Sequence, residues 1–477
     1  MDAHRLAYPV PFDDLPVDPR PDLDRLGIAR ALVTHTLSLY SDAEAGNDAL
    51  FALGDPRLVP VPVVVPGVPG ACAPATPDAV RAWGVRMVRL CPERHRFDLT
   101  GPVALRWLAA LGAGAAPGPA VAVDLDETST AQLRTLAERL PGLRILVLNP
   151  GYRRLRALAE LMAEAPGVRV ETGTVNTQGG VEWLAERFGA ERLVFGTGAP
   201  RGRRLRPALP PRPPRPDPAR DRPDRGGLPG KAARRPPMIL DAHGHVGTWP
   251  DFLIPDPTAG GLVAAMDRIG VTAMGISHLL AVGPDAGRGN RLAREIAERH
   301  PGRFGVWQVY NPHHRTPLSR DGVWGVKLHP DVHQCRLDDP RYDPVWELGL
   351  PVLSHGQTDS PWSDPEQFAT VAARHPDVPI LMGHTGLWPS GFARAARLVA
   401  GHPNVFLEVC GSKSTGRWIA RLASLAGGRN GWSSARTPAS STSGSAMAAS
   451  PWLPSPPADR ALIQGGNLAR ILGPRLP

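Results

Sequence analysis

The chain contains two similar halves on either side of a proline-rich segment, and this internal repeat limits the folds open to it. Gly27–His35 resembles Gly270–His278, and Val88–Pro92 resembles Val326–Pro330. Further matches follow in the same order along both halves, which argues against coincidence. We therefore predict two copies of one domain.

Residues 201–237 separate the two copies, which we place at residues 1–200 and 238–477. Eleven residues of this segment are proline, and residues 201–235 hold eleven Arg and one Lys against three Asp. Such a composition without apolar periodicity cannot form a packed core, so we predict a linker. Its charges account for the whole formal net charge of +9. The copies are therefore neutral, which excludes a basic nucleic-acid groove as the source of the charge.

Each copy alternates short apolar runs with amphipathic stretches. In the second copy the runs include Ala273–Ile276, Phe304–Val309 and Pro379–Leu381, and one amphipathic stretch spans Asn290–His300. This alternation is typical of βαβ units and a parallel sheet. The number of runs favours an α/β fold of the (β/α)₈ TIM-barrel type over an open sheet.

Polar motifs follow several apolar runs of the second copy, at the strand end where a barrel carries its chemistry. They are Asp241–His245, Lys327–Pro330, Ser354–Gly356 and Gly383–Gly386, and Glu408 follows a later run. A single histidine after a strand is more often a hydrogen-bonded loop residue than a ligand. Four successive strand ends that each offer histidine point instead to a shared divalent metal, because neutral imidazole is its commonest ligand.

These motifs together resemble the amidohydrolase superfamily, specifically the amidohydrolase-related branch that includes aminocarboxymuconate-semialdehyde decarboxylase-like enzymes. Gly465–Arg470 also resembles the C-terminal helix of that branch. The resemblance implies a distorted TIM barrel with one divalent metal ion, for which zinc is the favoured identity. The ion would lower the pKa of a bound water and polarise a bond of a small substrate.

The resemblance also implies a role for each histidine of the motifs. His243, His245 and His355 would bind the metal. His384 would orient the metal-bound water and His329 would line the substrate pocket, so these two are the predicted catalytic residues. The branch contains non-oxidative decarboxylases as well as hydrolases of C–N or C–O bonds. Hydrolysis of a small, cyclic or aromatic substrate is our main prediction, and decarboxylation stays open.

The second copy departs from the family pattern at its eighth strand, where a run such as Phe-Gly-Thr-Asp would supply a metal-binding, proton-accepting aspartate. Residues 429–456 are instead rich in Ser, Ala and Pro. The codons of this segment permit Val-Phe-Gly-Thr-Asp in another frame, and the first copy keeps Val194–Thr197 at the matching place. We infer compensating frameshifts, and the same origin is open for residues 201–237. If both segments are genuine, a catalytically inactive scaffold is the competing interpretation.

The first copy lacks the histidine set. Cys91 stands where the second copy has His329, and Asn149 stands where it has His384. His4 has no second histidine beside it. We therefore predict that the first copy is a degenerate barrel that binds no metal.

Other sequence features narrow the class of protein and its expected location. No stretch approaches the roughly 18 apolar residues of a membrane span, and Met1–Arg5 does not begin a signal peptide. Four scattered cysteines favour a reducing compartment over a disulfide scaffold. We expect a cytoplasmic enzyme that acts on a small-molecule substrate, without nucleic-acid or membrane partners. Homo-oligomerisation stays open.

Overall fold

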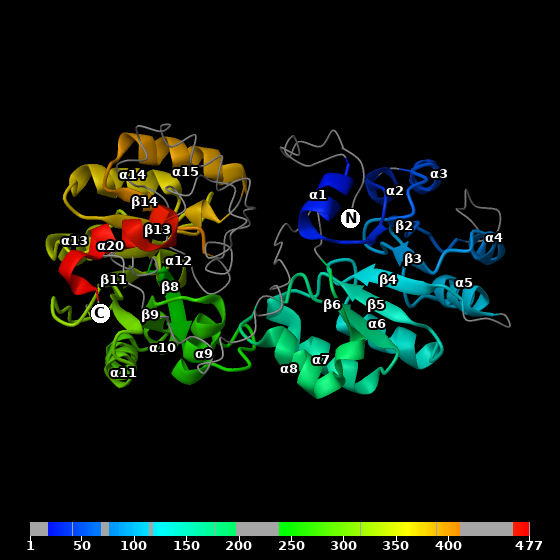
Figure 1. Cartoon of the computed structure of the whole chain (residues 1–477), viewed down its shortest axis with the longest axis horizontal. Coiled ribbons are helices and arrows are strands. Elements are labelled where there is room, and N and C mark those ends of the chain that lie inside the picture. The colour runs from blue at the N-terminus through cyan, green and yellow to red at the C-terminus, as the bar shows by residue number, and fades with distance from the viewer. Residues whose placement is uncertain are drawn as a thin grey trace, which may run out of the picture. The chain divides into compact units, whose positions relative to one another are not determined.

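The computed structural model describes residues 18–40, 42–67, 76–113, 118–175, 177–196, 238–314, 316–387, 389–410 and 461–476. The chain divides into two compact units (Figure 1). One comprises Met1–Arg204 with Gly247–Thr258, and the other comprises Leu205–Val246 with Ala259–Pro477. The predicted linker at 201–237 and the aberrant segment at 429–456 lie outside the described residues. The predicted domain boundaries stay predictions.

The second unit is built on one seven-stranded sheet whose strand order follows the chain order, from β8 to β14. All neighbouring strands are parallel, so their carboxyl ends lie on the same rim. The strands are β8 (Leu240–Val246), β9 (Ala273–His278), β10 (Phe304–Val309), β11 (Gly325–Leu328), β12 (Val352–His355), β13 (Ile380–Gly383) and β14 (Val405–Leu407).

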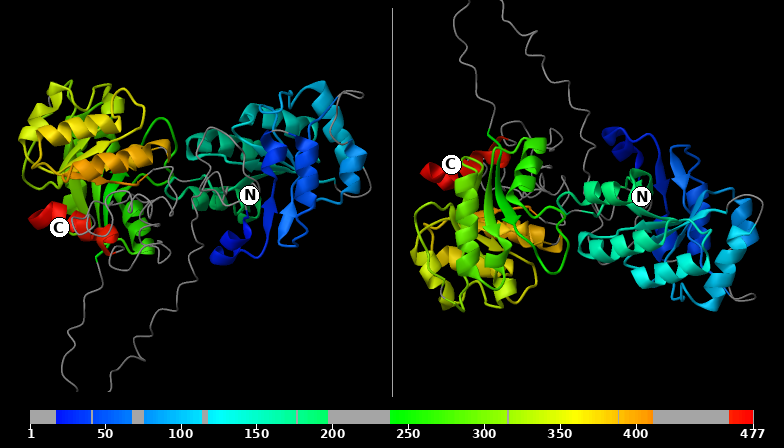
Figure 2. Two further views of the ribbon diagram at one scale, coloured as in Figure 1. Left: turned by 90° about the horizontal axis from the view of Figure 1, so that it is seen from above. Right: turned by 90° about the horizontal axis from the view of Figure 1, so that it is seen from below.

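Helices between the strands lie around the outside of this sheet (Figures 1 and 2). The amphipathic stretch at Asn290–His300 lies in α11 up to Arg299, and His300 is its C-cap. The helix begins after Asp285, whose carboxylate accepts a bond from Arg288 N at 2.9 Å. The α-helices are α9 (Ala259–Ile269), α10 (Leu279–Val282), α11 (Ala286–Arg299), α12 (Pro330–His333), α13 (Asp343–Glu347), α14 (Pro365–Arg374), α15 (Pro389–Gly401) and α20 (Asn467–Leu472). Shorter helical turns are η4 (Pro340–Tyr342), η5 (His384–Gly386), η6 (Leu462–Gly466) and η7 (Gly473–Arg475).

Two tryptophans fill the space beside the first strands of this sheet. Trp307 and Trp324 meet edge to face, with ring centroids 6.2 Å apart, and Trp307 Nε1 donates to the Ala242 carbonyl at 2.7 Å. A Cβ at Gly305 would lie 1.9 Å from Cε2 of Trp324. The glycine in β10 is therefore required by the indole ring that packs on it.

The parallel sheet with helical connections confirms an α/β fold of the TIM-barrel type. In the described part of the second unit the sheet has β8 and β14 as its edges. Residues 429–456, where the family pattern expects the eighth strand, lie outside the described ranges.

The first unit contains a parallel sheet in the order β3-β4-β5-β6-β7 and a separate parallel pair, β1-β2. Its strands are β1 (Ala31–Val33), β2 (Leu58–Pro60), β3 (Met87–Leu90), β4 (Ala120–Asp124), β5 (Ile145–Leu148), β6 (Val168–Glu171) and β7 (Leu193–Val194). Its helices are α1 (Arg20–Leu26), α2 (Thr36–Tyr40), α3 (Ala43–Phe51), α4 (Pro77–Ala82), α5 (Pro102–Gly112), α6 (Thr130–Arg139), η2 (Tyr152–Arg154), α7 (Leu155–Glu164), α8 (Gly180–Phe188) and η3 (Ala190–Arg192).

Asn47 and Asn290, which stand at matching places in the internal repeat, make similar contacts in the two units. The Asn47 amide bonds both backbone polar groups of Val63, at 2.7 and 2.9 Å, and the Asn290 amide bonds both those of Val309, at 2.9 and 2.8 Å. Asn290 thus ties α11 to β10, and Asn47 ties α3 to Val63, which forms an isolated bridge with Arg89 of β3. These paired contacts support the repeat, whose origin by duplication stays a prediction.

No helix among the described residues is both long enough and apolar enough to cross a membrane.

Candidate metal centre

His243 and His245 project from β8, the first strand of the second unit. The pairing of β8 with β9 shifts register between Asp241 and Gly244, and such an irregularity can re-aim the side chains beside it. A Cβ at Gly244 would lie 2.3 Å from Sδ of Met274, so Met274 packs directly against the backbone between the two histidines. The two imidazole centroids lie 5.1 Å apart.

The structure brings all five predicted site histidines together at the carboxyl rim of the sheet. Ring centroids are 5.2 Å apart for His243 and His384, 4.7 Å for His384 and His355, and 4.3 Å for His355 and His329. With His245 they form one continuous cluster, because its ring lies beside His243. Four different strands therefore contribute to one site, as parallel strands allow. The roles predicted for the five side chains stay predictions.

The fully buried His243 ring lies between an acid and a base. Its Nδ1 is hydrogen-bonded to Glu408 Oε2 at 2.9 Å, and its Nε2 is hydrogen-bonded to Lys327 Nζ at 2.8 Å. Glu408 and Lys327 are 0% and 1% exposed. Burial raises the pKa of Glu408 well above its usual range and lowers the pKa of Lys327 to about 8. Burial thus favours the uncharged form of both groups that bond the imidazole.

Burial keeps the imidazoles neutral. It is the main cause that lowers the pKa of His243, His329 and His384 well below the ordinary value, with nearby positive groups adding to it. The pKa of His245 and that of His355 fall to about 3, by burial first and by Lys327 second. A neutral imidazole keeps a lone pair, which metal binding requires.

Neighbouring polar groups hold the rings of His245, His329 and His355. Ser277 Oγ and Nδ1 of His245 are joined by a hydrogen bond of 2.9 Å. The His329 Nδ1 accepts a bond from Val332 N and so caps α12. The Nε2 of His355 lies 3.7 Å from an Asp331 carboxylate oxygen.

His384 stands in an unusual backbone conformation just after β13. It has φ 62°, and Thr385 after it has φ 50°; such left-handed geometry costs about 1–3 kcal/mol per residue and is concentrated at functional sites. Bonds to β14 hold the turn in place, since Thr385 Oγ1 donates to the Glu408 carbonyl at 2.9 Å and His384 N donates to Glu408 Oε2 at 3.3 Å. These bonds hold the backbone from which the His384 ring projects.

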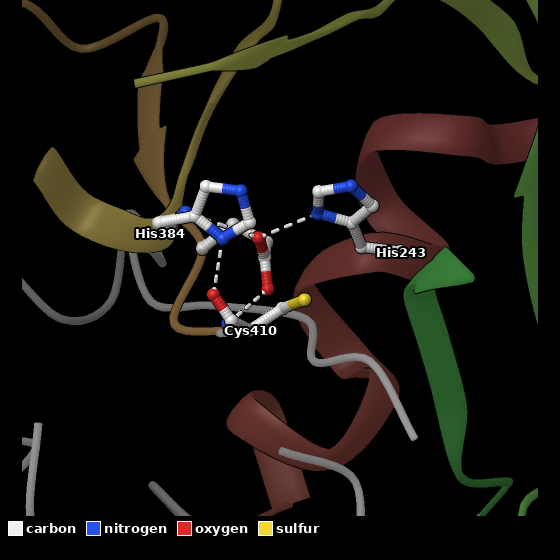
Figure 3. A group of neighbouring side chains, drawn as sticks. His243, His384 and Cys410 are labelled. Atoms are coloured by element: carbon white, nitrogen blue, oxygen red, sulfur yellow. Dashed lines mark hydrogen bonds and ion pairs between the residues drawn. The ribbon is translucent and has the colours of Figure 1, made fainter. Parts of the chain in front are cut away.

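One group of donors in the described residues has the composition of a metal site. His243, His384, Glu408 and Cys410 each offer a ligand atom, and these atoms lie within 4.8 Å of one another. Figure 3 shows His243 and His384 beside one carboxylate group, with the carbonyl oxygen of Cys410 bonded to the His384 ring. Sequence reasoning assigned no role to Lys327 or Cys410. The signal for Cys410 was its place two residues beyond Glu408, at the end of an apolar run.

The first unit keeps the outline of this rim with different side chains. Asn149, which stands where the second unit has His384, also has positive φ, at 47°. Asn149 N donates to Glu171 Oε2 at 3.4 Å, as His384 N does to Glu408. Asn149 also bonds Asp124, which faces Arg89 at 3.9 Å. His4 and the residues after 196 lie outside the described ranges, and the prediction that this copy binds no metal stays a prediction.

Several solved structures are similar to this chain over about half its length. A 2,6-dihydroxybenzoate decarboxylase from Rhizobium is 18% identical, with a TM-score of 0.38, over 49% of this chain and 98% of its own. A 5-carboxyvanillate decarboxylase from Sphingomonas paucimobilis is 16% identical, with a TM-score of 0.38, over 50% and 99%. A zinc-bound amidohydrolase from Burkholderia multivorans is 15% identical, with a TM-score of 0.38, over 50% and 100%.

No curated protein matches the chain. The family model described as Amidohydrolase matches residues 2–215 and 240–463, which is most of the chain and both halves of it. With a parallel α/β sheet and a histidine cluster at its carboxyl rim, the chain belongs to the amidohydrolase family of enzymes.

Proposed function

We propose that the second unit is a metal-dependent hydrolase, in which a metal-activated water attacks a C–N or C–O bond of a small substrate. The observation that carries this proposal is the convergence of five histidines on one rim, where they meet the buried pair Lys327 and Glu408. His243 is buried and the other four are half-buried. Apolar side chains would stabilise this part of the fold at least as well as imidazoles and charged groups do. The cluster therefore indicates a functional role.

The side chains fit a divalent transition metal. The donors are mainly imidazole, with one carboxylate and one thiol within reach, and this mixture suits zinc better than magnesium or calcium, which prefer oxygen. The family resemblance implies His243, His245 and His355 as the residues that would hold the ion. Bound there, the ion would supply a water of lowered pKa and a Lewis acid for the substrate.

The remaining side chains position the reactants. His384, whose Nδ1 bonds the Cys410 carbonyl, presents a fixed ring with which to orient the water. His329, stacked on His355 at 4.3 Å, supplies a flat polar wall for the substrate. Glu408 holds His243 through Nδ1, in the way that outer carboxylates orient histidine ligands.

A substrate panel tests the reaction. Zinc-loaded full-length protein is incubated with lactones, amides and aryl carboxylates, and the products are separated by liquid chromatography. Hydrolysis of a lactone or amide that is lost on metal removal is the expected result. Release of carbon dioxide from an aryl carboxylate, without hydrolysis, would make the site a decarboxylase instead. Conversion of no substrate by a fully metal-loaded protein would favour an inactive scaffold.

A further inference from the structure

We propose that Asp331 is a positioning residue of the metal centre, whose carboxylate accepts a hydrogen bond from the ring Nε2–H of His355. The inference rests on the metal dependence proposed above and keeps its ligand set of His243, His245 and His355. It adds the group that orients one of these ligands, and it fixes which ring nitrogen of His355 is free for the ion.

The first support is the position of the Asp331 side chain. Asp331 lies in the first turn of α12, directly after β11, and His355 ends the neighbouring strand β12. Oδ2 of Asp331 lies 3.7 Å from Nε2 of His355. A movement of about 0.7 Å would bring these two atoms to hydrogen-bond distance. A bond at Nε2 leaves the lone pair of the neutral ring on Nδ1, and metal-binding histidines are usually oriented in this way by a carboxylate at the other nitrogen.

The second support is that two serines hold the carboxylate in place. Ser360 Oγ donates to Asp331 Oδ1 at 2.6 Å, and Ser363 Oγ donates to Asp331 Oδ2. The two serines are 6% and 0% exposed. Their hydroxyls accept bonds from Trp362 N and Gln357 N in turn. Each carboxylate oxygen has two lone pairs, so Oδ2 can still accept a second bond. The loop after β12 therefore fixes the carboxylate beside the histidine that ends that strand.

The third support is the contrast with the first unit. The internal repeat aligns Glu93 with Asp331, directly after the matched runs, and the strand register aligns Asp124 with His355. Glu93 has 67% of its side chain exposed and pairs with Arg96 at 2.8 Å, whereas the Asp331 side chain is 21% exposed. The acidic side chain is thus mostly buried in the unit that has the histidine and mostly exposed in the unit that lacks it.

The fourth support is charge. A divalent ion among neutral imidazoles needs negative charge nearby, because an uncompensated buried charge costs several kcal/mol. Lys327 and Glu408 do not supply it, since burial favours the uncharged form of both, and their charges would cancel if both were ionised. Asp331 adds a carboxylate beside the cluster. Burial is the main cause that lowers the pKa of His384, and Asp331 is among the groups that act in the opposite direction, so its charge is felt in the site.

The test measures the zinc affinity of the full-length protein by competition with a chelating dye. Affinity should fall about 10–100-fold in Asp331→Asn, which is the usual cost of losing such an outer partner. Asp338→Asn is the matched control and should keep the wild-type affinity. The Asp338 side chain is 19% exposed, and its carboxylate pairs with Arg336.

Two further measurements separate positioning from a purely structural role. A structural role alone would lower the thermal unfolding midpoint of the metal-free protein and leave the zinc affinity of the folded protein unchanged. Positioning should also alter the visible spectrum of bound Co²⁺ in Asp331→Asn and not in Asp338→Asn, because these bands depend on how the ligands are arranged. Ser363→Ala, which keeps the carboxylate and removes one bond to it, should lower zinc affinity less than Asp331→Asn does.

A crystal structure of the zinc-loaded wild-type protein gives a readout that needs no variant. We expect Oδ2 of Asp331 to lie about 2.7–3.2 Å from Nε2 of His355, with zinc on Nδ1 of that ring. Zinc bound to Nε2, or a separation still near 3.7 Å, would overturn the inference.

The outcomes separate the positioning role from the function. Unchanged zinc affinity in Asp331→Asn, or an equal fall in Asp338→Asn, would overturn the inference and leave a metal-dependent enzyme. Absence of zinc binding by the folded wild-type chain would overturn both proposals.

Discussion

At the scale of single residues, the centre of the site is the hydrogen-bonded line from Lys327 through His243 to Glu408. The positions of the five histidines followed from the sequence, because residues just past parallel strands must share a rim. The hydrogen bonds from Lys327 through His243 to Glu408 could not be predicted. Nothing in the sequence tells how deeply Lys327 is buried or which ring nitrogen of His243 it reaches. The left-handed turn at His384 was equally hidden, since a His-Thr pair does not by itself favour positive φ.

Replacing Lys327 by methionine should change how stability depends on pH. Burial lowers the Lys327 pKa from 10.5 to about 8, so between these values the unfolded chain holds a proton that the folded chain has released. The free energy of unfolding therefore rises with pH across this window, by up to a few kcal/mol at about 1.4 kcal/mol per pKa unit. In Lys327→Met this rise should disappear.

Urea unfolding of the metal-free protein between pH 7 and pH 10.5 measures the effect. The chain has only two other lysines, Lys231 and Lys413. Burial raises the pKa of the Cys91 and Cys335 thiols, so these groups lower the stability as the pH rises. The contribution of Lys327 is therefore the difference between the two pH profiles. Parallel pH profiles for Lys327→Met and the wild type would show that the buried amine does not control this dependence.

At the scale of elements, the strands and helices are placed by contacts that the sequence encodes only in part. The capping carboxylate of Asp285 and the apolar periodicity of α11 are readable in advance. The need for glycine at 305 is not, because it arises from Trp324, which lies just before β11 and packs against β10. Such close approaches depend on the tertiary fold.

Adding one methyl group in β10 should destabilise the second unit. In Gly305→Ala the new Cβ meets the Trp324 ring at 1.9 Å, and overpacking of this kind costs about 1–3 kcal/mol. Gly401→Ala is the control, since a Cβ there meets nothing within 4 Å. Thermal unfolding should show a lower midpoint for Gly305→Ala alone. Equal midpoints for both variants would mean that Trp324 does not pack on Gly305.

The link between α11 and β10 should depend on the Asn290 amide. Asn290→Ala leaves the backbone N–H and carbonyl of Val309 without their bonds at 2.8 and 2.9 Å, and each buried unpaired group costs about 1–3 kcal/mol. Arg291→Ala, at an exposed position on the same helix, is the control. Hydrogen exchange should quicken at Val309 in Asn290→Ala. Unchanged protection there would remove Asn290 as the connection.

At the scale of the whole molecule, the two halves share a plan and differ in chemistry. Asn47 and Asn290 make equivalent bonds, yet only the second rim gathers histidines in the described residues. The sequence already showed that the first copy has Cys91 where the second has His329, and Asn149 where the second has His384. It could not indicate the arrangement around Cys410, since that depends on the turn at His384.

Restoring the alternate frame should increase activity if residues 429–456 arose by compensating frameshifts. A version carrying the alternate-frame translation would regain Val-Phe-Gly-Thr-Asp and its proton acceptor, which is worth about 10²–10⁴-fold in rate. Both versions are compared for turnover and bound metal on the same substrate panel. Equal activity of the two would contradict the frameshift account and support the written sequence.

The most direct test of the account is the metal content of the purified full-length protein, measured by elemental analysis. We expect about one zinc-type ion per chain, carried by the second unit, and loss of that ion in His243→Ala. His402→Ala, at a histidine outside the cluster, should keep it. Two ions per chain, no ion in a folded sample, or an ion that His243→Ala leaves in place would contradict the account.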